Sequence, residues 1–271
     1  MGKDTNIGWT DHTFNPWKGC TKVSEGCLHC YAEDWAKRFN QVTWNAPPIL
    51  TSKAKWREPK KWNKELGENE TATVFCASLA DIFDQNAPNE WRDRVWDLIE
   101  ATQKLTYLLL TKRPEAAVEQ FPYHLPNAWL GVTIENQKRL EERMPLIHEC
   151  QAKHKFLSIE PLLEKITLKH HDLSDIDWII VGGESGSKAR PFHLEWGSNL
   201  ISECQELGIP VFMKQLGSNA YWQGESFKTR SSHGDDISEF PSFLQVQNFP
   251  TFRDTEEKFK DRGQQLTLNL D

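Results

Sequence analysis

Short apolar segments alternate with helical patterns from residue 73 to residue 215 of this 271-residue chain. Such alternation is typical of a parallel sheet, because each helix returns the chain across the sheet in a right-handed crossover. We therefore expect an α/β fold, a full or partial TIM-like (β/α) barrel of parallel strands. The sequence predicts strands over residues 7–10, 73–77, 106–110, 129–134, 155–159, 178–181 and 210–213, and helices over 31–39, 60–66, 88–102, 137–152 and 194–207.

Polar side chains follow the later predicted strands at their carboxyl ends. In a barrel of parallel strands these ends share one mouth, where active sites lie. We therefore expect the polar residues to gather around a single site. They are Ser78, Asp81, Lys112, Arg113, Glu135, Asn136, Glu160, Glu184, Lys214 and Gln215.

Three of these residues, Lys112, Arg113 and Lys214, would give the mouth positive charge suited to a phosphate or a carboxylate on a substrate. Charge balance is an equally good interpretation, because acidic residues follow neighbouring strands. Glu160 stands directly before Pro161, and we interpret it as a substrate-binding residue, since a carboxylate at a strand end rarely lacks a partner. The acidic residues available to balance the cations are Glu135, Glu160 and Glu184.

Cys20, Cys27 and Cys30 form the spacing C-x6-C-x2-C after the first predicted strand. Three thiolates on one loop suit a 4Fe-4S cluster that keeps one iron open, and they also suit zinc with a fourth protein ligand. The third cysteine precedes the predicted helix 31–39, whose N-terminus should lower the thiol pKa. Because the loop follows a strand, we expect it at the same mouth as the polar residues. The remaining cysteines are isolated, and we interpret them as inert core thiols: Cys76, Cys150 and Cys204.

The composition of the chain excludes several classes of protein. Its formal net charge of −7 gives no global attraction to nucleic acid or to a membrane surface. The sequence has no run of about 18 apolar residues that would predict a membrane span, and its first residues show no signal-peptide pattern. Six cysteines are too few for a disulfide scaffold in a chain of this length. We expect a cytoplasmic protein.

Residues 40–72 interleave basic residues with aromatic ones, among them Trp44, Trp56 and Trp62. This pattern is the chain's strongest candidate for contact with a nucleic acid, since rings stack on bases and cations pair with phosphates. A solvated lid whose lysines face water explains it equally well. We expect an irregular insertion with one short helix, within a barrel domain of residues 1–217. The alternation then ends, which predicts a C-terminal extension or cap over residues 218–271, formed by a short hairpin or by a loop.

Short motifs along the chain carry a family resemblance: Asn15-Pro16-Trp17-x-Gly19-Cys20, Gly26-Cys27-x-x-Cys30-Tyr31, Thr111-Lys112-Arg113-Pro114, Ser158-Ile159-Glu160-Pro161-Leu162 and Val181-Gly182-Gly183-Glu184-Ser185-Gly186. As a set they resemble a phage- and prophage-borne family of uncharacterised proteins with a three-cysteine motif. The cysteine loop and the alternating strands are similar to those of the radical S-adenosylmethionine (radical SAM) superfamily. The similarity runs from about residue 6 to residue 217.

The resemblance implies that Cys20, Cys27 and Cys30 hold three irons of a 4Fe-4S cluster. S-adenosyl-L-methionine would chelate the fourth iron through its amino and carboxylate groups. An electron from a donor would then cleave S-adenosylmethionine and release a 5′-deoxyadenosyl radical, which takes a hydrogen atom from a substrate. The usual spacing in the superfamily is C-x3-C-x2-C, so the cysteine loop of this chain is longer.

The resemblance also implies residues that contact S-adenosylmethionine. By position, Ser78 or Asp81 would bind the methionyl amine, and Glu135 would bind the ribose hydroxyls. His29 stands where the superfamily often has an aromatic ring near the adenine. A further candidate is the segment Gly182-Gly183-Glu184, whose glycines allow the backbone to approach the cofactor closely or simply form a tight turn.

We expect a radical SAM enzyme that modifies a nucleic acid or a nucleotide. The alternative is a zinc- or iron-sulfur-stabilised protein without radical chemistry, which binds nucleic acid or acts as a partner in a phage or defence system. Formation of 5′-deoxyadenosine distinguishes the two.

Overall fold

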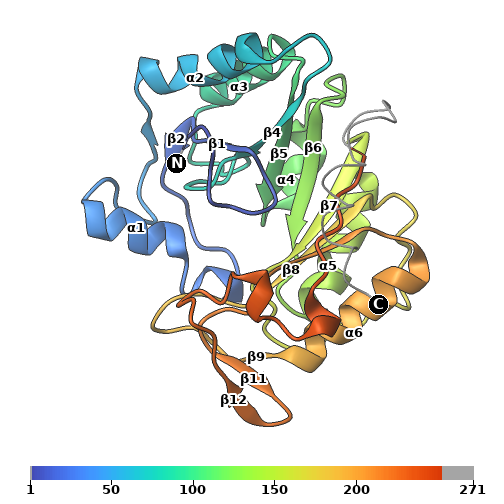
Figure 1. The fold of residues 1–271 in the computed structure, drawn as a ribbon. Coiled ribbons are helices and arrows are strands. Elements are labelled where there is room, and N and C mark those ends of the chain that lie inside the picture. Colours follow the sequence, from blue (N-terminus) through green and yellow to red (C-terminus); the bar gives the residue numbers. More distant parts are fainter. Residues whose placement is uncertain (1, 252–271) are drawn as a thin grey trace.

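A seven-stranded parallel sheet forms the centre of the computed structural model of the protein, which describes residues 2–251. The strand order is β1-β4-β5-β6-β7-β8-β10, with β1 and β10 at the edges. The sheet curls into a half-barrel (Figure 1), which confirms the α/β fold expected as a partial TIM-like barrel. Its strands are β1 (His12–Phe14), β4 (Ala72–Cys76), β5 (Leu105–Thr111), β6 (Ala128–Thr133), β7 (His154–Ile159), β8 (Trp178–Gly182) and β10 (Val211–Gln215).

The first strand lies later in the chain than the sequence predicts. Residues 7–10 contain a turn, and β1 begins at His12, where it pairs with β4 in parallel. Just before this point the carboxylate of Asp11 accepts hydrogen bonds from the amide and the hydroxyl of Thr73, at 2.8 and 2.9 Å. The prediction of a strand over 7–10 is therefore wrong, because pairing with β4 decides where the strand begins, and local apolarity does not.

Helices connect the strands and cover the outer face of the sheet (Figure 1). The helices predicted over 31–39 and 194–207 are confirmed with the same bounds, and those predicted over 88–102 and 137–152 are confirmed with differences of one to three residues at their ends. Sequence reasoning missed α4, although Pro114 at its first position is a common helix start. The helices are α1 (Tyr31–Phe39), α2 (Lys53–Glu65), α3 (Asn89–Glu100), α4 (Pro114–Gln120), α5 (Gln137–Glu149) and α6 (Leu194–Leu207).

Aromatic side chains pack on the face of the sheet opposite the helices. Alternate residues of the central strands reach this face, because side chains along a strand alternate between its two sides. The rings of Trp9 and Phe75 lie 4.6 Å apart, and Trp178 lies 6.1 Å from Phe212. This packing supports a structural role for many of the chain's tryptophans. The cluster consists of Trp9, Phe75, Leu108, Trp129, Phe156, Trp178, Ile180 and Phe212.

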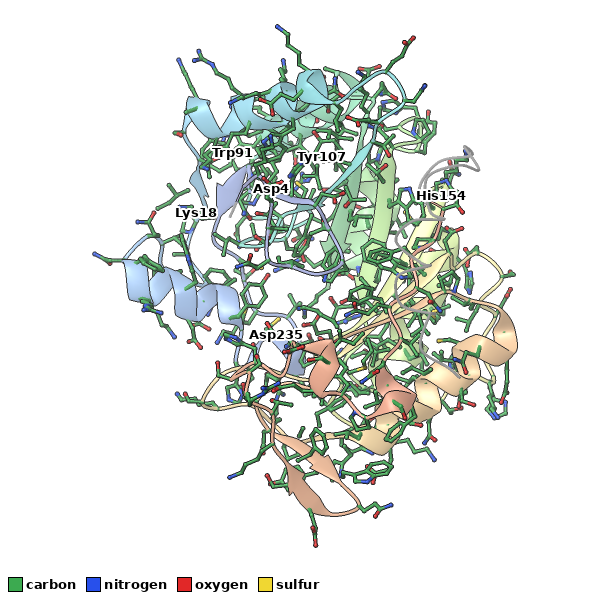
Figure 2. The ribbon with its side chains drawn as sticks, viewed as in Figure 1. Asp4, Lys18, Trp91, Tyr107, His154 and Asp235 are labelled. Carbon is green, nitrogen blue, oxygen red and sulfur yellow. The ribbon has the colours of Figure 1, made fainter. Side chains whose placement is uncertain are left out.

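Residues 40–72 are more regular than the sequence predicts. The short strand β3 (Ile49–Leu50) pairs antiparallel with β2 (Trp17–Lys18), and α2 runs for 13 residues. Trp56 and Trp62 of α2 are buried, and Arg94 of α3 lies over the Trp56 ring at 4.2 Å. Side chains fill the space between these helices and the sheet, around Tyr107 in Figure 2. The exposed basic residues on the outer side of α2 are Lys53, Lys55, Arg57, Lys60, Lys61 and Lys64.

Past residue 217 the chain adds a small sheet and two short 3-10 helices. β11 (Ala220–Trp222) and β12 (Glu225–Phe227) form the expected hairpin, and β9 (Phe192–His193) pairs with β11. Two short 3-10 helices follow, η2 (Ile237–Glu239) and η3 (Ser242–Leu244). Part of the predicted extension, residues 252–271, lies outside the described residues. None of the helices within residues 2–251 is both long and apolar enough to cross a membrane.

Candidate functional site

Cys20, Cys27 and Cys30 line one cavity of about 110 Å³ at the carboxyl ends of β4, β5 and β6. The residues that share it come from three strand ends, so the cysteine loop and several of the predicted polar residues meet as expected. Further residues lining the cavity include Tyr31, Trp44, Ser78, Asp81, Thr111, Lys112, Arg113 and Thr133.

Each cysteine is held by a different piece of local structure. Cys20 follows Gly19, whose φ of +106° and hydrogen bond to the carbonyl oxygen of Leu79 tie the loop to the end of β4. Cys27 ends the 3-10 helix η1 (Glu25–Cys27), and Cys30 is the N-cap residue of α1. The prediction that the third cysteine stands at a helix start is confirmed.

All three cysteines belong to the lining of the same cavity. Within residues 2–251, no group of three or more histidine, cysteine or acidic side chains is close enough to hold a single metal ion. Tetrahedral zinc with bonds of about 2.3 Å would need its sulfurs about 4 Å apart. A 4Fe-4S cluster binds each cysteine through a different iron and therefore separates the sulfurs further. Three cysteine sulfurs on one cavity are the donor set that a 4Fe-4S cluster with one open iron needs, so the residues present fit that group by their chemistry.

The thiol pKa values run against the sequence prediction. Burial raises the pKa of Cys30 and outweighs the lowering effect of the backbone N–H groups at the start of α1. Burial also raises the pKa of Cys20, and the nearby carboxylate of Asp81 adds to this effect, while Arg113 partly offsets it. The start of α1 does lower the pKa of Cys30 as expected, but the net shift is upward, because desolvation of a thiolate dominates in this cavity. Binding of iron would have to displace these protons.

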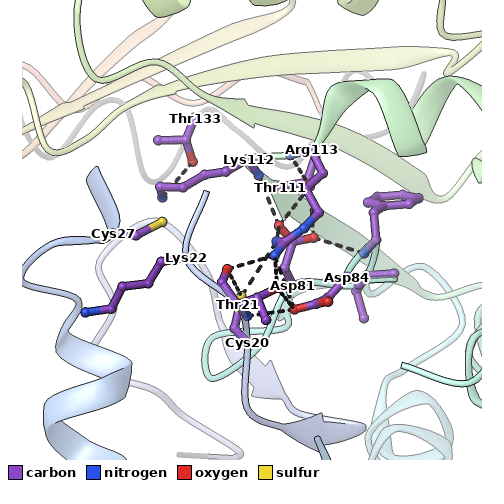
Figure 3. Close-up of polar contacts among 12 residues, drawn as sticks. Cys20, Thr21, Lys22, Cys27, Asp81, Asp84, Thr111, Lys112, Arg113 and Thr133 are labelled. Carbon is purple, nitrogen blue, oxygen red and sulfur yellow. Dashed lines mark hydrogen bonds and ion pairs between the residues drawn. The ribbon is translucent and has the colours of Figure 1, made fainter. Parts of the chain in front are cut away.

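Arg113 connects the first cysteine to two buried aspartates (Figure 3). Its Nη1 donates to Asp81 Oδ2 at 2.8 Å and to the sulfur of Cys20 at 3.6 Å. Its Nη2 donates to the carbonyl oxygen of Thr21 at 2.7 Å and lies 3.2 Å from Asp84 Oδ2. The sequence placed Arg113 at the mouth as a substrate-binding candidate, but did not indicate these partners.

Ser78 and Asp81, the candidates for the methionyl amine, already have protein partners. Asp81 accepts hydrogen bonds from Thr111, from Arg113 and from the backbone amides of residues 83 and 112. The hydroxyl of Ser78 accepts a hydrogen bond from Asn15, and its carbonyl oxygen accepts one from the Tyr31 hydroxyl. The contacts give both residues a structural role, and the amine role stays a prediction.

Lys112 differs from its neighbours in its partners. It lines the cavity with the cysteines, and its Nζ donates to Thr133 Oγ1 at 3.3 Å (Figure 3). It forms no ion pair within the part of the chain that the structure describes. Lys214, by contrast, is ion-paired with Glu160, as the charge-balance interpretation expects. Both lie outside the residues that line the cavity.

Glu135 anchors the middle of the cysteine loop from the end of β6. Its side chain is fully buried, pairs with Arg143 of α5 at 2.6 Å and accepts a hydrogen bond from the Ser24 hydroxyl. A Cβ at Gly26 would stand 2.5 Å from its Cγ. Sequence reasoning missed Arg143 and Ser24, and its assignment of Glu135 to the ribose hydroxyls stays a prediction.

Glu184 anchors the other side of the loop. His29 Nδ1 lies 3.1 Å from Glu184 Oε2, and Arg190 Nη2 lies 2.6 Å from Oε1. Arg190 also donates to the carbonyl oxygen of Glu25 at 2.9 Å. Burial alone would raise the pKa of Glu184, but the hydrogen bonds from Arg190 and His29 lower it below its usual range. His29 thus contacts a carboxylate here, and its predicted place near the adenine stays a prediction.

Of the two glycines before Glu184, Gly183 has a packing reason for being glycine. A Cβ at Gly183 would overlap the carbonyl oxygen of Leu216, so close approach of two backbone segments explains this residue without a cofactor. A Cβ at Gly182 would stand 3.3 Å from Cγ of Glu160. The cofactor role of both glycines stays a prediction.

Comparisons with solved structures give partial matches to spore photoproduct lyase. A double mutant with bound AdoMet and dinucleoside spore photoproduct has a TM-score of 0.47 and 12% identity. A complex with dinucleoside spore photoproduct has a TM-score of 0.46 and 11% identity. In both cases the match covers 67% of this chain and 58% of the other, so this chain spans less than two thirds of those proteins.

The comparison with curated proteins gives no significant match. A family model does match, and it extends over residues 4–259, nearly the whole chain. The protein therefore belongs to the family described as protein of unknown function (DUF5131).

Proposed function

We propose that the protein is an iron-sulfur enzyme of the radical SAM type. One observation carries this proposal: three cysteines line a single cavity at the carboxyl ends of a parallel half-barrel. Active sites of such barrels lie at this end of the strands.

In this proposal Cys20, Cys27 and Cys30 hold three irons of a 4Fe-4S cluster, and the fourth iron stays open for the amino and carboxylate groups of S-adenosylmethionine. When bound, the cluster and S-adenosylmethionine together would supply a 5′-deoxyadenosyl radical that takes a hydrogen atom from a substrate. The chain itself contributes the walls of the cavity, which keep water away from the reacting atoms. A reductant must also reach the site, so an electron donor is a proposed partner.

Among the proposed ligand-binding residues, Lys112 has the strongest support. It lines the cavity and has no ion-pair partner within residues 2–251, so its ammonium is available to a carboxylate or a phosphate. Arg113, Glu160 and Lys214 remain candidates, although each already pairs with an opposite charge. The cofactor-binding candidates remain His29, Ser78, Asp81, Glu135, Gly182, Gly183 and Glu184.

For the substrate we propose a nucleic acid or a nucleotide. The cation in the cavity and the exposed basic side of α2 favour an anionic substrate. Trp44 lines the cavity and could stack on a base, whereas Trp56 and Trp62 are buried in the core. We further propose that residues 1–217 form the catalytic half-barrel domain and that residues 218–271 extend it.

The proposal is tested by anaerobic reconstitution with iron and sulfide, followed by reduction in the presence of S-adenosylmethionine. We expect broad violet-blue absorbance and formation of 5′-deoxyadenosine, both lost in C20A, C27A and C30A. The control is C204A, because Cys204 is a buried thiol of α6 outside the cavity. A protein that keeps zinc and never binds iron and sulfide would overturn the proposal. A cluster without 5′-deoxyadenosine, combined with tight nucleic-acid binding, would favour the alternative without radical chemistry.

A further inference from the structure

We propose that Arg113 is a positioning residue that sets the reduction potential of the cysteine site through its hydrogen bond to Cys20. This inference rests on the proposed function, since it concerns a cluster held by the three cysteines. It assigns Arg113 a role that differs from direct binding of the substrate.

The first observation is the contact itself. Arg113 Nη1 donates to Cys20 Sγ at 3.6 Å, and the arginine is only 5% exposed. Among the described residues, the sulfur of Cys27 has a longer side-chain hydrogen bond, to the Ser24 hydroxyl at 3.9 Å. The sulfur of Cys30 has no side-chain hydrogen bond in this part of the chain. Cys20 is thus the one cysteine of the three that has a charged donor in this part of the chain.

The second observation is that the guanidinium is fixed. Asp81 and Asp84 pair with its two terminal nitrogens, at 2.8 and 3.2 Å. Thr21, directly after Cys20, accepts two hydrogen bonds from Nη2, at 2.7 and 2.6 Å. The amide and the hydroxyl of Thr21 also donate to Asp84, at 2.8 and 2.9 Å. The planar fork of Arg113 therefore holds both the aspartates and the cysteine loop in one arrangement, which a lysine would not reproduce.

This arrangement controls charge at the ligand sulfur. Reduction of a cluster adds negative charge that spreads onto its sulfurs, and hydrogen bonds to those sulfurs are one of the protein's means of tuning the potential. A buried cationic donor stabilises the reduced form more than the oxidised form, because the low-dielectric interior strengthens the interaction. Arg113 should therefore raise the potential. The carboxylates of Asp81 and Asp84 should lower the potential. Cys20 therefore lies beside one cation and two anions, whose effects on the potential have opposite signs.

Because Arg113 and the aspartates should shift the potential in opposite directions, variants of each give a direct test. The midpoint potential of the reconstituted protein is measured by potentiometric titration, with the absorbance of the cluster as the readout. R113K keeps the charge but not the fork, and we expect a more negative midpoint potential than that of the wild type. D84N keeps Arg113 paired with Asp81 and removes one anion, so we expect a more positive midpoint potential. The two shifts should differ in sign.

A matched control is R92K. Arg92 is 3% exposed and donates to the carbonyl oxygens of Ile82 and Asp84, so it also lies beside the aspartates, but within residues 2–251 it donates no hydrogen bond to a cysteine. Its replacement should lower thermal stability and leave the potential unchanged. Iron content and thermal unfolding of each variant show whether the fold and the cluster are retained.

The outcomes separate the inference from the proposed function. Unchanged potentials in R113K and D84N, with a full iron content, would overturn the role of Arg113 while leaving the cluster proposal intact. If R113K folds but holds no iron, R113Q replaces it in the titration: it keeps a neutral side-chain donor, so its midpoint potential should again be more negative than that of the wild type, and an unchanged potential would overturn the role of Arg113. A wild-type protein that assembles no cluster would overturn both proposals.

Discussion

Gly26 lies where the cysteine loop meets the buried carboxylate of Glu135, and its replacement by alanine tests how tightly the loop is held. A Cβ at this position would stand 2.5 Å from Cγ and 2.6 Å from Oε1 of Glu135. Glu135 is fully buried and paired with Arg143, so it has little room to move aside. An extra methyl group in such packing costs about 1–3 kcal/mol of folding free energy.

We therefore expect G26A to lower Tm by roughly 2–4 °C for each kcal/mol lost. The variant should also take up less iron on reconstitution, because the displaced loop carries Cys27. Gly67 offers a matched control, since the nearest atoms to its Cβ position also belong to a glutamate, Glu70, at 3.3 Å. Both of these residues are exposed, and although Glu70 accepts a hydrogen bond from the Gly67 amide at 2.9 Å, its side chain faces solvent and can shift to admit a methyl group. G67A should change the free energy of unfolding by less than about 0.5 kcal/mol.

A double-mutant cycle measured by thermal or denaturant unfolding gives the decisive result. E135A alone leaves Arg143 buried without its partner, which costs about 3–5 kcal/mol. Once Glu135 is shortened, an alanine at position 26 has nothing to meet, so the double variant should be little less stable than E135A. If the two losses simply add, the clash with Glu135 is not the cause and the reasoning is refuted.

Three further predictions concern single side chains. The pKa of Glu184 is lower in the folded protein than its ordinary value of 4.5, so the ionised carboxylate stabilises the fold above that pH, and this contribution is lost as the pH falls through the folded-state pKa. Tm should therefore fall more steeply with acidification in the wild type than in E184Q. Parallel curves of Tm against pH would contradict this. K112M should weaken binding of S-adenosylmethionine or a nucleotide by about tenfold in calorimetric titration, as loss of about 1.4 kcal/mol of binding free energy implies. The control K138M, on the exposed side of α5, should bind as tightly as the wild type. Equal affinities of K112M and the wild type would remove Lys112 from the site. W62A should cost about 3–5 kcal/mol of the free energy of unfolding, because Trp62 is 3% exposed and its ring centroid lies 4.6 Å from that of His12. A nearly neutral effect in denaturant unfolding would contradict its place in the core.

The alternation of apolar strands and helices was enough to predict a parallel sheet in a full or partial barrel, and the structure decided that it is a half-barrel. Each strand is buried on both faces, so its residues form a continuous apolar run that is visible in the sequence. The same logic correctly placed Asp81, Lys112 and Arg113 near the cysteine loop, since parallel strands end at one edge. Local chemistry also determined that Cys30 begins a helix.

Only the tertiary structure decided which charges pair. Glu184 meets His29 although 155 positions separate them in the chain, and Glu135 meets Ser24 across 111 positions. The sequence placed these carboxylates at strand ends, but it did not indicate their partners, because a pairing between distant segments depends on how the loops pack.

The structure likewise decided the environment of the thiols and of the tryptophans in the insertion. The sequence determined that three cysteines share one loop, yet burial raises the pKa of Cys20 and Cys30 where the helix N-terminus alone would lower it. Trp56 and Trp62 read as possible stacking surfaces in the sequence, and the packing of α2 buries them. Desolvation depends on every segment that covers a residue, so it is a property of the assembled fold and is not encoded in the local pattern.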